Sequence, residues 1–127
     1  MAGLTNLHEI LASLRPSVRE GRFVVITSPG VLDVPADAHI IEAEGTTLVV
    51  AQQVADERGL DYDSVYAWIT LQVHTSLDAV GVTAAVATAL ARVGISCNVL
   101  AGFYHDHLLV PEASVDEAVD VLGGLDQ

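Results

Sequence analysis

Two histidines flank an aspartate in the segment His105-Asp106-His107. If this segment is a strand, His105 and His107 point to one face and Asp106 points to the other. Two imidazoles at this spacing are a common half of a metal site, and His74 could add a third ligand from a neighbouring strand end. The sequence has no cysteine pair, no His-x-x-x-His and no acidic companion at an obvious spacing. We therefore predict no metal and no cofactor, and we expect one histidine to cap a ligand pocket while the other packs under a sheet or at a partner interface.

The single cysteine, Cys97, lies within an apolar run over residues 95–101. A thiol in such a place usually behaves as a small hydrophobic group with a raised pKa, not as a nucleophile. Catalysis would also require His105 or His107 to face the same side of the hairpin as the thiol. The sequence therefore predicts a protein without catalytic activity, and a small metal- or cysteine-dependent enzyme is the last of the alternatives.

The charge balance excludes two classes of partner. The chain has 127 residues, 17 of them acidic and 5 basic, which gives a formal net charge of −12. Binding to nucleic acid or to an anionic membrane needs clustered cations, and all five basic residues here are scattered arginines. No apolar run approaches the ~18 residues of a membrane span. Without a recognisable signal peptide, and with one cysteine, the sequence suggests a cytoplasmic protein.

The elements that must position these side chains are short and well separated. In order, the first half is expected to contain a helix over residues 7–14, a buried strand over 23–26, a loop over 31–38, hairpin strands over 39–43 and 46–50, and a helix over 51–58. In the second half we expect a strand over 66–73, a helix over 79–93, a strand over 95–101, a turn over 102–103, a strand over 104–110 and a last helix from Ser114, opened by a capping box with Glu117.

The expected helix over residues 79–93 has an unusual outer face. No charged residue occurs from Ala79 to Ala91, where the outward positions are threonine or alanine. A helix without a polar face is usually covered on more than one side. We therefore expect it to pack against a second half of the molecule or against a partner chain.

The two halves share a weak internal echo. Residues 47–50 run into a helix that ends at Gly59, and residues 107–110 run into a helix that ends at Gly123, at an offset of about 60. This echo predicts two similar halves, residues 1–62 and 63–127, although coincidence between ordinary α+β segments would produce the same pattern.

The expected element order of the second half is that of a ferredoxin-like β-α-β-β-α-β unit without the last strand. Three of its features are Gly81 at the start of the uncharged helix, the Gly94-Ile95-Ser96 step into the next strand, and the segment over residues 103–111. In these features the second half resembles the ACT domain, a regulatory module that binds amino acids in metabolic enzymes. The last of these resembles the subgroup that includes cytoplasmic arginine sensors. The resemblance implies an α+β sandwich of two interlocked ACT-like halves with antiparallel sheets.

The resemblance also implies where a ligand would bind, at the turn between the first strand and the first helix. Glycine and the amide groups at a helix start suit a carboxylate there. The implied set is Ser76, Asp78, Val80, Gly81, Val82, Asn98, Val99, His105 and Asp106. Asp78 could pair with an α-ammonium group and Ser76 could supply a neutral hydrogen bond. Alternatively, Ser76 or Asp78 only caps the helix and Gly81 only permits close packing.

The sequence therefore predicts a regulatory or allosteric module that binds an amino acid and forms a homo-oligomer. The widespread family signature has Asp-x-Pro-Gly where this chain has Ala79-Val80-Gly81, so the resemblance does not imply which amino acid is bound. The alternative is an interaction module without a ligand, which binds another protein through the uncharged helix face.

Overall fold

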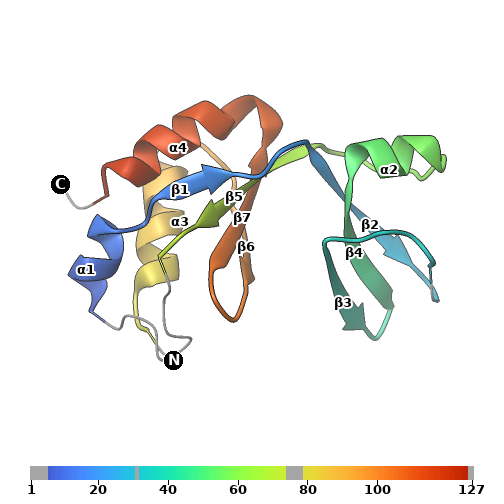
Figure 1. Cartoon of the computed structure of the whole chain (residues 1–127), viewed down its shortest axis with the longest axis horizontal. Coiled ribbons are helices and arrows are strands. Elements are labelled where there is room, and N and C mark those ends of the chain that lie inside the picture. The colour runs from blue at the N-terminus through green and yellow to red at the C-terminus, as the bar shows by residue number, and fades with distance from the viewer. Residues whose placement is uncertain (1–5, 31, 74–78, 126–127) are drawn as a thin grey trace. The chain divides into compact units, whose positions relative to one another are not determined.

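The structure is a computed structural model that describes residues 6–30, 32–73 and 79–125. The chain divides into two compact units, which we call unit 1 (Met1–Arg19 and Ala67–Gln127) and unit 2 (Glu20–Tyr66). The chain leaves unit 1 after Arg19 and returns to it at Ala67, so it crosses between the units twice. The division proposed from the sequence, into residues 1–62 and 63–127, has one crossing. Both units combine antiparallel strands with helices, which confirms the α+β class (Figure 1).

In the described part of unit 1, four strands lie in the order β1-β5-β7-β6. The strands are β1 (Pro16–Val18), β5 (Tyr66–Leu71), β6 (Asn98–Ala101) and β7 (Asp106–Pro111), and the helices are α1 (Leu7–Ala12), α3 (Val82–Arg92), a short 3-10 turn η1 (Glu112–Ser114) and α4 (Val115–Gly123). Strand β1 pairs antiparallel with β5, and β6 pairs antiparallel with β7. The N-terminal segment thus supplies the strand that the second half lacked in the sequence.

The helices of unit 1 cover one face of its strands (Figure 1). Alternate residues of β5 and β7 point into a core shared with α1, α3 and α4. This core contains Ala67, Ile69, Leu71, Leu108 and Val110 from the strands and Ile10, Leu14, Val82, Val86, Leu90, Val115, Ala118 and Leu122 from the helical segments. The period of two in a strand therefore places Trp68, Thr70 and His107 on the opposite, helix-free face.

Unit 2 is built from three strands and one helix. Strands β2 (Phe23–Ser28), β3 (Ala38–Glu42) and β4 (Gly45–Ala51) lie in the order β3-β4-β2, and α2 (Gln52–Glu57) packs on them. Its core contains Val24, Ile26, Leu48, Val50 and Ala55. In the connection between β2 and β3, Arg58 donates to the Asp33 carbonyl at 2.8 Å and the Asp37 amide donates to the Val49 carbonyl at 2.8 Å.

Most expected elements are present with shifted ends. Strand β6 starts at Asn98 instead of residue 95. Strand β7 starts at Asp106, because the turn before it occupies residues 102–105 instead of 102–103. Strand β1 was missed, since three residues beginning with proline carry almost no periodic signal. Among the described residues, none of the helices has the length and apolarity that a membrane crossing would require.

The predicted capping box at Ser114 is wrong. The chain already turns as η1 before α4 begins, and the Ser114 side chain makes no capping hydrogen bond. A true N-cap residue needs an extended backbone, which the preceding 3-10 turn does not allow. The cap at α1 does form, with the Asn6 side chain accepting from the Glu9 amide at 3.1 Å.

Candidate functional site

A hollow in unit 1 lies between the start of α3 and the strands beneath it. Its lining is apolar except for one hydroxyl and one carboxyl group, and consists of Leu71, Val82, Thr83, Val86, Val99, Asp106 and Leu108. Three residues implied by the sequence, Val82, Val99 and Asp106, thus meet in one place. The hollow is narrow, because none of its space is wide enough for a water molecule.

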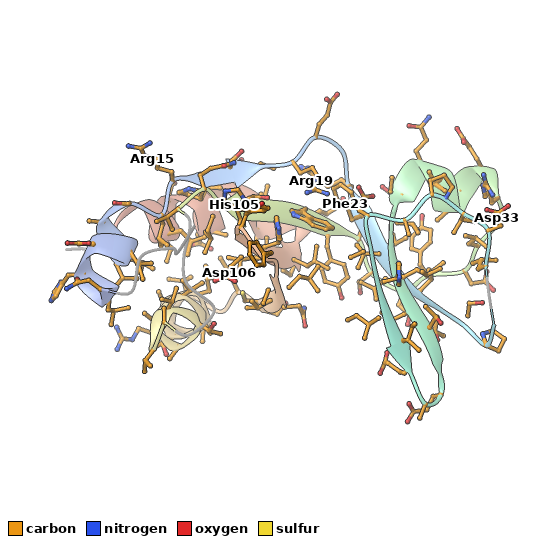
Figure 2. All side chains as sticks on the ribbon, turned by 60° about the horizontal axis from the view of Figure 1, so that its bottom comes forward. Arg15, Arg19, Phe23, Asp33, His105 and Asp106 are labelled. Atoms are coloured by element: carbon orange, nitrogen blue, oxygen red, sulfur yellow. The ribbon has the colours of Figure 1, made fainter. Side chains whose placement is uncertain are left out.

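Asp106 supplies the charge of this hollow. It is the first residue of β7 and pairs with Ala101, so its side chain shares the helix-covered face with Leu108 (Figure 2). Burial raises the pKa of its carboxyl group, and the neighbouring His107 acts in the opposite direction. A half-buried carboxylate of this kind favours a cationic partner.

The start of α3 faces the same hollow. Gly81 occupies the N-cap position with φ of 91°, a left-handed conformation that favours glycine, and no side chain of the described residues caps the helix. The first amides of a helix have no partner within the helix and carry partial positive charge. Val82 and Thr83 of this first turn both line the hollow. The site therefore brings together a carboxylate that can pair with a cation and backbone amides that can donate to an anion, beside an apolar wall.

Of the other residues implied by the sequence, those that the structure describes do not line this hollow. Ser76 and Asp78 lie outside the described residues, as does His74. Val80 is 83% exposed just before the N-cap, Asn98 is exposed on β6, and His105 lies in the turn before β7. Thr83 was not singled out in the sequence, where it appears as one of several outward threonines of the uncharged helix.

The helix-free face of unit 1 carries a second cluster, centred on His107. The Trp68 indole donates to His107 Nδ1 at 3.1 Å, and Thr70 Oγ1 lies 3.0 Å from the same nitrogen. The guanidinium of Arg19 lies 3.9 Å from the centre of the Trp68 ring (Figure 2). His107 therefore packs against the helix-free face of the sheet. The sequence predicted that one of the two histidines packs in this way. The sequence could not reveal its partners, which are 37 and 39 residues away.

Metal ligands and an activated nucleophile were also sought among the described residues. No group of three histidine, cysteine or carboxylate side chains in this part of the chain could hold a metal ion. Burial raises the pKa of the Cys97 thiol, as expected from the apolar run over residues 95–101, although Cys97 itself lies just before β6.

Unit 2 has a hollow of its own, which the sequence did not indicate. Its volume is about 230 Å³, and it is lined by Gly30, Leu32, His39, Ile41, Thr46 and Leu48. This lining is mostly apolar and contains no carboxylate, so it lacks the paired charges found in unit 1.

Comparison with protein families decides the relationship suggested by the sequence. One ACT domain model matches residues 63–123, and a second matches residues 2–67. The chain belongs to the ACT domain family. ACT domains are generally regulatory modules that respond to small molecules, and both halves of this chain are of that type. The resemblance to the arginine-sensor subgroup stays a prediction.

Solved structures agree on the ACT fold. A Vibrio cholerae protein of unknown function, described as a possible transport protein, is 42% identical, with a TM-score of 0.84 over 91% of this chain and 92% of that one. Aspartate kinase from Clostridium acetobutylicum, described as an allosteric enzyme, is 12% identical with a TM-score of 0.66, over 88% of this chain and 34% of the enzyme. An aspartokinase of alpha and beta subunits is 15% identical with a TM-score of 0.61, over 87% and 95%. The ferredoxin-like ACT fold is thereby confirmed. Among proteins with curated descriptions, none matches the chain in sequence.

Proposed function

We propose that this ACT protein binds a small amino acid in the hollow at the start of α3 and acts as a regulatory module without catalysis. The observation that carries the proposal is the meeting of the Asp106 carboxylate, the first turn of α3, which no described side chain caps, and an apolar wall. An α-amino acid has the complementary groups, which are an ammonium next to a carboxylate and a side chain. Membership of a family of small-molecule regulators supports the same function.

In the proposed complex, the α-ammonium group pairs with Asp106, and the α-carboxylate accepts from the amides of Val82 and Thr83. The ligand side chain packs against Val99. Ser76, Asp78, Val80 and Gly81, from the segment before α3, are further proposed ligand-binding residues, and Asn98 and His105 form the rim. Because the hollow is narrow, binding must widen it, and this favours a small ligand.

A thermal-shift screen of the twenty amino acids tests this function. A ligand that binds only the folded chain stabilises it by about 2.7 kcal/mol at 100 times its Kd, so one amino acid should raise the Tm clearly. Asp106→Asn should abolish that shift, and Asp116→Asn, on the exposed side of α4, should retain it. If no amino acid raises the Tm at millimolar concentration, the proposal fails.

A protein-interaction function is the second candidate, and exposed apolar side chains favour it. Phe103 and Tyr104 stack edge to face in the β6–β7 turn with 66% and 64% of their surfaces exposed, and Ile41 of β3 is 82% exposed. The outer face of α3, with Thr83, Ala84 and Thr88, is also exposed in the single chain. We propose that a homo-oligomer or a protein partner covers such surfaces, in a reducing compartment such as the cytoplasm. Sedimentation of the chain with and without the Phe103→Ser and Tyr104→Ser changes tests self-association, which the changes should weaken.

A further inference from the structure

The bonding around His107 requires one particular form of its ring. An indole N–H can only donate, so the bond from Trp68 Nε1 to His107 Nδ1 at 3.1 Å requires a lone pair on that nitrogen. The proton of the neutral ring must then sit on Nε2. Trp68 is only 3% exposed, so its indole has little access to water as a substitute acceptor.

The ring has little room to turn away from Trp68. A methyl group placed on Gly102 would lie 3.1 Å from His107 Nε2 and 2.6 Å from the His105 carbonyl oxygen, so the hairpin backbone closes on the ring from its other edge. The Gly102 amide also donates to that carbonyl at 2.9 Å and fixes this part of the turn. The His107 imidazole thus lies between the Trp68 indole N–H, which can only donate, and the turn at Gly102.

We propose that this arrangement is a proton-sensitive lock between β5 and the β6–β7 hairpin, closed when His107 is neutral and opened when its Nδ1 takes up a proton. A proton on Nδ1 would face the indole N–H, so two donors would oppose each other and the bond between Trp68 and His107 would be lost. The hydroxyl of Thr70, 3.0 Å from Nδ1, would become the only acceptor near the new N–H among the described residues.

The charges around the lock oppose protonation. Arg19, from the segment after β1, lies over the Trp68 ring, and the His105 ring centre is 6.4 Å from that of His107. From β5 the ring meets only the neutral Trp68 and Thr70 side chains, and within the hairpin Asp106 favours the charged form. Burial acts most strongly, followed by Arg19 and His105, and together they lower the pKa of His107 below its ordinary value of 6.5. The lock therefore opens below pH 6.5.

The fluorescence of Trp68 tests the lock, because it is the only tryptophan of the chain. On titration of the full chain from pH 8 to 4.5, without any ligand, the Trp68 emission should fall and shift to longer wavelength with a midpoint below 6.5. The indole N–H resonance in NMR spectra should move over the same range. Far-UV circular dichroism should stay constant through this step, which separates it from global unfolding.

Two matched variants decide whether His107 is responsible. His107→Asn places an amide oxygen near the position of Nδ1 and cannot be protonated, so it should keep the indole bond and abolish the transition. His105→Asn should keep the transition and raise its midpoint, because it removes a charge that opposes protonation of His107. A transition that persists in His107→Asn, or an unmodified chain whose Trp68 signals do not change before unfolding, would overturn the proposal. Either result leaves the amino-acid proposal untouched, since no ligand is present.

Discussion

Asp106 destabilises the ligand-free chain at neutral pH. Burial raises the pKa of its carboxyl group, so the folded state holds the proton more tightly than the unfolded state. The protonated carboxyl group therefore favours the folded state. This contribution to stability is fully present below the ordinary pKa of 3.8 and is lost as the pH rises through the raised pKa of the folded state. A side chain kept at this cost is typical of a binding site.

We predict that Asp106→Asn raises the Tm by a few degrees at pH 7, with an advantage that shrinks as the pH falls toward 4. Thermal unfolding of the free protein across this range measures the effect. Asp116→Asn, which removes a favourable charge from the first turn of α4, should lower the Tm slightly or leave it unchanged. A Tm lower than that of the original chain for Asp106→Asn at pH 7 would mean that the carboxylate has a structural role.

Single residues were predictable where their environment is local. The raised pKa of Cys97 follows from the apolar run around it, and the opposite faces of Asp106 and His107 follow from strand alternation. The bond between Trp68 and His107 could not be foreseen, because it depends on the register of β5 against β7, which no short segment specifies.

At the scale of elements, Gly102 determines how tightly the β6–β7 hairpin can close. A methyl group there would lie 2.6 Å from the His105 carbonyl oxygen, which is backbone and cannot move aside without opening the turn. We predict that Gly102→Ala lowers the free energy of unfolding by about 1–3 kcal/mol, measured by urea denaturation.

Gly123→Ala is the matched control for that substitution. Gly123 is the last residue of α4, and a methyl group there meets nothing within 4 Å. Since alanine is the better helix former, this variant should be neutral or more stable by up to about 1 kcal/mol. Equal losses from both variants would show that the close approach at Gly102 has no special effect.

Elements with a long periodic signal were predicted well, and those set by their neighbours were not. The uncharged stripe of α3 was recognised over three turns. The three residues of β1 form a strand because they pair with the edge of β5. Ser114 does not cap α4 because the 3-10 turn η1 comes directly before that helix. The family resemblance indicated a missing strand but not its source.

For the molecule as a whole, unit 1 depends on a segment distant in sequence. Residues 6–19 supply α1, β1 and the fully buried Ile10 and Leu14. Losing one such side chain to alanine costs about 2–5 kcal/mol, and losing the whole segment also exposes the edge of β5. Residues 63–127 by themselves should therefore lack a stable core.

Fragment complementation measures this dependence. A fragment of residues 63–127 should give a poorly dispersed NMR spectrum, and adding a peptide of residues 1–19 should produce a folded one. The same peptide with Ile10→Asp and Leu14→Asp should have no effect. A fragment that is folded without the peptide would refute the dependence on the N-terminal segment.

The double passage of the chain between units also affects its synthesis. All the strands of unit 2 and its helix lie within Glu20–Tyr66, so this unit can fold as soon as those residues leave the ribosome. The stripe of Leu7, Ile10, Leu11 and Leu14 is made earlier, yet its core partners in β5, α3 and α4 are made last. During translation, this apolar stripe therefore stays exposed without its core partners until unit 2 has been synthesised. In that interval we expect it to be a binding site for chaperones.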